Sequence, residues 1–170
     1  FFKYYTTKLL KSPYFAHEVP GTGLLFYQYR KPLIFYYMLK TEHIGIAVKD
    51  LSASVSLFEK LLQTSCYKTE IVESEKVATA FLQVGETKIE LLESQTEDGV
   101  IAKFIQKKGE GIHHIAFEVE DIYTEIERLK KEGFILLSNE PKNGADNKLV
   151  CFLHPKNTNS VLIEICQQKK

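Results

Sequence analysis

Large apolar side chains stand at every second position between residues 43 and 48, where Ile44, Ile46 and Val48 share one side of the chain. This period of two predicts a half-buried strand whose other side begins with His43. The next residues change to a helical period. They predict a helix with an apolar stripe made of Leu51, Val55, Phe58 and Leu62.

This pattern of strand and helix occurs twice in the chain. His43–Leu51 lies over His114–Ile122 at an offset of 114 − 43 = 71 residues, with His, Ile, Val and Asp recurring at matched places. Later in each half, Lys88–Leu91 matches Leu162–Ile165 at an offset of 164 − 90 = 74 residues. The repeat predicts that each half folds as a strand, a helix and then three strands.

Turn signals separate the short strands that end each half. Gly85-Glu86 lies between strands predicted over Val77–Val84 and Thr87–Glu93, and a turn beginning at Pro155 precedes a strand over Val161–Cys166. A short helix is predicted between the halves, over Val100–Lys108. The expected fold class is α+β, with two tandem βαβββ modules (about residues 41–98 and 111–167) that form one curved mixed sheet around a cleft.

Residues 1–37 differ in composition from the rest of the chain. They hold 12 of the 20 aromatic residues and 3 of the 5 prolines, with five basic residues against one acidic residue. Neither period continues here, so we expect a non-domain extension followed by a single domain over residues 38–170. Met38, the only methionine, is the expected natural start, and upstream read-through, an expression extension or a mitochondrial presequence would each explain the segment. Deleting residues 1–37 is expected to leave stability and activity intact.

The overall charge balance hides this division. The whole chain carries 22 basic and 22 acidic residues, whereas residues 38–170 carry 17 and 21, a net charge of −4. This balance argues against nucleic-acid binding, and no apolar run approaches the roughly 20 residues that span a bilayer. The 3 cysteines form no C-x-x-C pair, which predicts a reducing compartment. We expect the cytoplasm, or the mitochondrial matrix if residues 1–37 are a presequence.

Four polar side chains occupy matched positions in the repeat. His43 and His114 begin the first strand of each half, and Glu90 and Glu164 lie in the last strands, on the side away from the neighbouring Ile and Leu residues. Each of them alone would more simply be a surface residue. Burying all four in apolar strands would be costly unless a cation lay between them. Imidazole nitrogen and carboxylate oxygen suit Co²⁺, Mn²⁺, Zn²⁺, Fe²⁺ or Ni²⁺, so these residues are the predicted metal ligands.

The remaining histidines and the cysteines have simpler explanations. His113 precedes His114, so the strand period places its side chain on the opposite face. There it is expected to have a structural role or to contact a metal-ligating residue without binding the metal itself. His154 opens a proline-containing turn, and it either shapes that hairpin or contacts an anionic substrate. The cysteines are expected to be small apolar residues.

Five sequence strings, in order, resemble the vicinal oxygen chelate superfamily and, within it, the methylmalonyl-CoA epimerase family. They are His43–Leu51, Gly85–Leu92, Gly111–Val119, Phe152–Lys156 and Val161–Glu164. The resemblance implies a divalent ion held by His43, Glu90, His114 and Glu164, with Co²⁺ as the first expectation and Mn²⁺, Ni²⁺, Zn²⁺ or Mg²⁺ as alternatives. It also implies a homodimer that interconverts (R)- and (S)-methylmalonyl-CoA by removing the α-proton through a metal-stabilised enolate.

Two features depart from the family pattern. Thr79 stands where some bacterial members carry a candidate catalytic Glu, so that base cannot be transferred to this chain. Ser160 replaces a glycine, and the family's Gly-Ala-His-Gly hairpin reads Gly-Ala-Asp-Asn over residues 144–147. Epimerisation needs proton carriers on both faces of the substrate, and the pseudo-symmetry offers Glu90 and Glu164 as the candidate catalytic pair.

Three other functions stay open on this scaffold. A lactoylglutathione lyase would use a similar set of metal ligands. An extradiol dioxygenase would use two His and one Glu and leave a site open for oxygen. The carboxylate of Glu90 at the fourth ligand position argues against a dioxygenase. A non-catalytic ligand-binding protein would need none of the four ligands. Exchange of the α-proton of labelled methylmalonyl-CoA, together with metal analysis, separates these alternatives.

Overall fold

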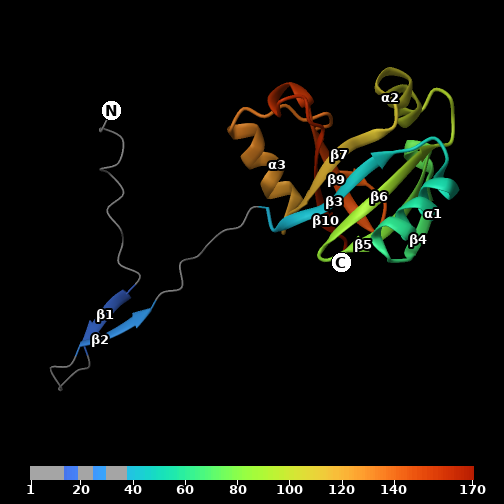
Figure 1. Ribbon diagram of the computed structural model, residues 1–170. Coiled ribbons are helices and arrows are strands. Elements are labelled where there is room, and N and C mark those ends of the chain that lie inside the picture. Colours follow the sequence, from blue (N-terminus) through green and yellow to red (C-terminus); the bar gives the residue numbers. More distant parts are fainter. Residues whose placement is uncertain (1–13, 19–24, 30–37) are drawn as a thin grey trace, which may run out of the picture. The chain divides into compact units, whose positions relative to one another are not determined.

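The computed structural model describes residues 14–18, 25–29 and 38–170 in two units, residues 1–35 and 36–170, which we describe separately (Figure 1). In the first unit, β1 (Tyr14–Glu18) pairs antiparallel with β2 (Leu25–Tyr29). The sequence pattern predicts no strand here, because apolar and polar residues do not alternate over a long enough run. These two strands were therefore not predicted, the non-domain extension stays a prediction, and the rest of residues 1–37 lies outside the described residues.

The second unit contains a mixed sheet of eight strands in the order β4-β5-β6-β3-β7-β10-β9-β8. β3 and β7 pair antiparallel at its centre, β3 is parallel to β6, and β7 is parallel to β10. Each half thus repeats one arrangement, which confirms the α+β class and the tandem modules. The strands are β3 (Lys40–Ala47), β4 (Cys66–Val72), β5 (Val77–Val84), β6 (Thr87–Ser94), β7 (Gly111–Glu118), β8 (Lys142–Asn143), β9 (Lys148–Leu153) and β10 (Ile163–Gln168).

Helices follow the first strand of each half and join the halves. α1 (Leu51–Leu62) packs on β5 and β6, α3 (Ile122–Lys131) packs on β9 and β10, and α2 (Val100–Lys108) lies between the modules in sequence (Figure 1). Asp50 caps α1 by accepting from the Ala53 N–H at 2.9 Å. Two short 3₁₀ turns, η1 (Glu73–Glu75) and η2 (Pro155–Asn157), complete the unit. No helix in the described part of the chain is long and apolar enough to cross a bilayer.

Strand alternation directs apolar side chains to the helices and polar side chains away from them. Leu91 of β6 is buried in the cluster beside α1, and Ile165 of β10 is buried in the cluster that contains Ile126 and Leu129 of α3. Burying each such side chain contributes roughly 1.5–3 kcal/mol. Because successive residues face opposite ways, this packing fixes the neighbouring Glu90 and Glu164 on the other face of the sheet.

The second module is less regular than the repeat predicts. β8 has only two residues, and β10 begins at Ile163 instead of the expected Val161. Asn159 and Ser160, with φ of 52° and 67°, lie in the left-handed region and delay the start of the strand.

Candidate metal centre

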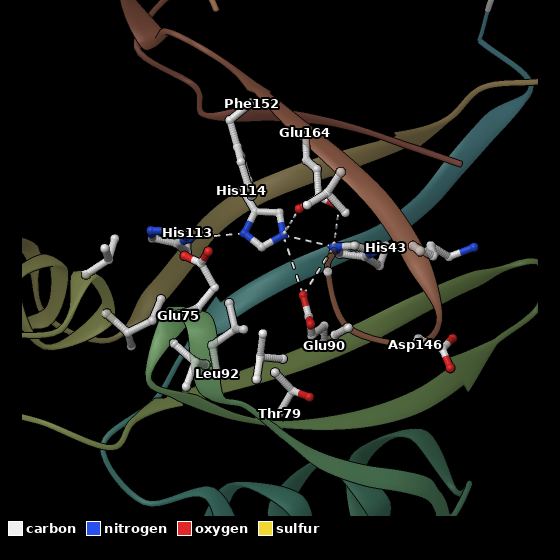
Figure 2. A pocket seen from close by; sticks show the side chains of 18 of the residues that line it. His43, Glu75, Thr79, Glu90, Leu92, His113, His114, Asp146, Phe152 and Glu164 are labelled. Atoms are coloured by element: carbon white, nitrogen blue, oxygen red, sulfur yellow. Dashed lines mark hydrogen bonds and ion pairs between the residues drawn. The ribbon is translucent and has the colours of Figure 1, made fainter. Parts of the chain in front are cut away.

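The four predicted ligands come from the four adjacent central strands of the sheet. Glu90 lies on β6, His43 on β3, His114 on β7 and Glu164 on β10, and each is at most 5% exposed. Figure 2 shows their side chains pointing toward one another from the two halves of the sheet. The structure therefore brings all four together, as the repeat predicts.

The distances between these side chains define a compact centre. The two Nε2 atoms of His43 and His114 are 2.8 Å apart, and Glu90 Oε2 lies 3.2 Å from the first and 3.5 Å from the second. Glu164 Oε2 is 3.5 Å from His114 Nε2, and its Oε1 is 3.9 Å from His43 Nε2. Both imidazoles thus present the same nitrogen to both carboxylates.

The donor set fits a divalent cation. Ligand atoms of His43, Glu90 and His114 all lie within 4.8 Å of one another, and Glu164 adds a second carboxylate beside them. Oε1 of Glu164 is buried without a hydrogen-bond partner, which is costly for a polar atom and which a cation would relieve. Two imidazole nitrogens with carboxylate oxygens match the preferences of borderline divalent ions.

Burial and mutual contact shift the pKa values within the centre. Burial opposes charging of His43, but the carboxylates of Glu90, Glu42 and Glu164 raise its pKa to about 10. Burial likewise opposes charging of Glu90, but His43 and His114 lower its pKa to about 2. Burial raises the pKa of Glu164 in spite of the two histidines. The contact between His43 and Glu90 therefore offsets part of the cost of burying both groups.

The predicted orientation of His113 is wrong. His113 lines the same pocket as His114, with the two Nδ1 atoms 3.0 Å apart (Figure 2). Its ring lies edge-on to Phe104. The pairing of β3 with β7 skips one residue here, since Gly45 pairs with His114 and the next residue pairs with Ile112. This bulge breaks the alternation on which the expectation rested. Burial, with smaller effects of His114 and Lys108, lowers the pKa of His113 to about 4, so its ring is neutral.

The pocket also contains residues that the sequence pattern missed. Glu75 of η1 and Lys142 of β8 both line it and form an ion pair, with Nζ and Oε1 2.5 Å apart. Asp146 lines it as well (Figure 2). Both partners of the pair lie in short, irregular elements without a period that could have marked them. Thr79 lines the pocket as well, and its hydroxyl donates to the backbone carbonyl of Glu70 at 3.4 Å.

The other polar candidates have structural roles. His154 Nδ1 accepts from the Lys156 N–H at 3.1 Å, and neither residue lines the pocket, so the hairpin role is the one observed. Cys151 and Cys166 are buried in apolar clusters, as expected, and Cys66 is half-buried.

Two βαβββ modules that share one buried centre of histidines and carboxylates define the class of this chain. It belongs to the Glyoxalase/Bleomycin resistance protein/Dioxygenase superfamily, whose sequence pattern matches residues 42–152. Several of its relatives in that superfamily are methylmalonyl-CoA epimerases. This finding confirms the resemblance of the five sequence strings to that family.

Three comparisons show how close these relatives are. The ethylmalonyl-CoA/methylmalonyl-CoA epimerase of Cereibacter sphaeroides is 41% identical over 130 residues, which are 75% of this chain and 97% of the relative. The human mitochondrial methylmalonyl-CoA epimerase is 38% identical over 129 residues, which are 75% of this chain and 73% of the relative. A structure of Streptomyces coelicolor methylmalonyl-CoA epimerase in complex with 2-nitronate-propionyl-CoA superposes with a TM-score of 0.75 at 33% identity, covering 77% of this chain and 95% of that one.

Proposed function

We propose that the protein is a metal-dependent epimerase that interconverts (R)- and (S)-methylmalonyl-CoA. The observation that carries the proposal is the convergence of two histidines and two glutamates from the four central strands, in a chain 41% identical to an epimerase of this substrate class. A non-catalytic binding protein would have no use for four polar groups buried at this cost.

His43, Glu90, His114 and Glu164 would hold the cation, for which Co²⁺ is the first expectation. When bound, such an ion supplies a Lewis acid that polarises the thioester and carboxylate oxygens of the substrate. The apolar side chains that line the pocket, which include Leu92 and Ile101, would limit the access of water to the reacting carbon.

We assign the proton transfer to Glu90 and Glu164. They reach the histidine pair from β6 and β10, on opposite sides of the β3–β7 pair, and this arrangement supports a role for each on a different face of a bound substrate. The hydroxyl of Thr79 cannot act as the base that a carboxylate provides in some relatives. Glu75 is a further carboxylate on the pocket wall, where it is paired with Lys142.

Conversion of each glutamate to glutamine separates the roles. We expect Glu90→Gln or Glu164→Gln to retain bound metal while losing the release of deuterium from α-labelled methylmalonyl-CoA, measured by mass spectrometry. Glu93→Gln, on the same strand as Glu90 but outside the pocket, is the matched control and should exchange normally. Full exchange in both variants would refute the assignment, and loss of exchange in Glu75→Gln would move the role to that residue.

Two further properties belong to the same proposal. We infer a homodimer from the resemblance to the epimerase family, and light scattering of the purified protein checks it. We infer a reducing compartment from the cysteine pattern, which is the cytoplasm if residues 1–37 are an extension and the mitochondrial matrix if they are a presequence. Bound metal without any α-proton exchange would favour the lactoylglutathione lyase alternative.

A further inference from the structure

The residue before each ligand histidine is the extra residue of a β-bulge. Between β3 and β7, Thr41 pairs with Phe117 and His43 pairs with Ala116, so Glu42 is skipped. At the other end of the same ladder, the skipped residue is His113. The two bulged residues lie at the offset of the repeat, 113 − 42 = 71 residues.

Each bulge turns a side chain toward the histidine that follows it. Bulges re-aim side chains that regular alternation would send to the other face. Glu42 and His113 therefore line the same pocket as the two ligand histidines. Glu42 Oε2 lies 2.6 Å from Nδ1 of His43, and His113 Nδ1 lies 3.0 Å from Nδ1 of His114.

These contacts occupy the ring nitrogens that face away from the centre. An imidazole that coordinates through Nε2 carries its proton on Nδ1, and that N–H needs an acceptor. With that proton on Nδ1, the Glu42 carboxylate would accept from His43, and the lone pair on Nδ1 of His113 would accept from His114. We propose that Glu42 and His113 are positioning residues that hold the two Nε2 atoms toward the cation, an inference that rests on the proposed metal centre.

The two acceptors are unequal. Glu42 is a buried anion, held by Nζ of Lys88 at 2.5 Å and Nζ of Lys148 at 3.2 Å. His113 is an imidazole that packs edge-on against Phe104, with ring centroids 5.0 Å apart. A carboxylate partner raises the basicity of a ligand imidazole more than a neutral partner does. His43 is therefore the stronger of the two histidine ligands, and changes at Glu42 have the larger effect.

The test measures Co²⁺ binding to the metal-free full-length protein by competition with a chelator. Loss of a hydrogen-bonding partner of this kind weakens metal binding by about 10–100-fold. We expect Glu42→Ala to weaken Co²⁺ binding by about 100-fold and His113→Phe by about 10-fold. The affinity of Glu42→Gln should lie between those of Glu42→Ala and the wild type. His113→Asn returns an acceptor at the place of Nδ1, so affinity should recover. The visible spectrum of the Co²⁺ protein should change in the same order.

Glu118→Gln is the matched control, because Glu118 contacts the same Lys148, at 3.5 Å, without touching a histidine, and it should bind Co²⁺ like the wild type. Circular dichroism of each metal-free variant verifies that it is folded. If Glu42→Ala or His113→Phe unfolds the chain, the Co²⁺ affinities of the conservative variants Glu42→Gln and His113→Asn still test the inference. Wild-type affinity in folded Glu42→Ala and His113→Phe would overturn the inference. The readout uses no substrate, so a wild-type protein that binds Co²⁺ but exchanges no α-proton would refute the proposed function alone.

Discussion

At the scale of single residues, the position of His114 depends on the missing side chain of Gly45. Gly45 pairs directly with His114 across the β3–β7 ladder. A Cβ atom at residue 45 would overlap the His114 ring, including Nε2 at 2.8 Å. The absence of a side chain at Gly45 thus leaves the space that the His114 ring occupies.

Gly45→Ala is expected to displace the His114 ring. The metal dissociation constant should rise by about tenfold or more, in line with the cost of misplacing a ligand, and crowding should cost about 1–3 kcal/mol of stability. Co²⁺ titration and thermal melting of the metal-free variant measure the two effects. Unchanged metal affinity would show that the ring moves without consequence for the site.

Ser160 is a second position at which backbone geometry affects the protein, here through its stability. Its φ of 67° lies in the left-handed region, which favours glycine. Ser160→Gly should stabilise the protein by about 0.5–1 kcal/mol, because relief of the Cβ strain exceeds the added flexibility of the unfolded chain. Urea unfolding measures this gain. Ser160→Ala, which keeps the Cβ atom, is the control, and equal stability of the two variants would contradict the explanation.

At the scale of elements, the turn between β8 and β9 ties the second module to the first. Asp146 in this turn contacts Lys88 at 2.6 Å and Lys68 at 3.2 Å, and its N–H donates to the carboxylate of Glu70. Lys142 of the second module likewise forms an ion pair with Glu75 of the first module. The two modules are therefore joined by ion pairs at the edge of the pocket as well as by the β3–β7 ladder.

Asp146→Ala is expected to cost about 1–2 kcal/mol of stability, between the values for exposed and buried ion pairs. The loss should shrink at high salt, since the pair is partly screened. Urea unfolding at low and high ionic strength measures both effects. Asp98→Ala, which removes the exposed pair with Lys76, should leave stability unchanged. Equal effects of the two substitutions would contradict a special role for the turn.

The elements were largely predictable, and their irregularities were not. α2 was predicted with its observed bounds, because its apolar period and Gly109 mark it in the sequence. The bulges at Glu42 and His113 were missed, since a period of two assumes that every residue takes part in the pairing. That assumption placed His113 on the wrong face and hid the partnership of Glu42 with His43.

At the scale of the whole molecule, the internal repeat explains why the four predicted ligands meet. Matched residues of two modules related by pseudo-symmetry come together where the modules join, so the repeat alone predicts the convergence of His43, His114, Glu90 and Glu164. The repeat does not predict that Glu75 and Lys142 also line the pocket. They come from short segments in which the two modules differ, and such segments have no counterpart for comparison.

We propose that residues 38–170 fold without residues 1–37. Met38 packs against the apolar cluster that contains Ile122 and Leu129 of α3, so it belongs to the second unit. A chain that begins at Met38 should keep the melting temperature and metal affinity of the full chain. A chain that begins at Lys40 loses Met38 and should be less stable. Failure of the longer truncated chain to fold would contradict the proposal.

We propose that this centre removes the α-proton of methylmalonyl-CoA with the help of a divalent ion. The most direct measurement follows the loss of deuterium from α-labelled methylmalonyl-CoA by the full-length protein, as purified, after chelation and after Co²⁺ is restored, with the metal content determined each time. We predict rapid loss of the label that stops on chelation and returns with the metal. Retention of the label by the protein with its metal bound would contradict the proposed function.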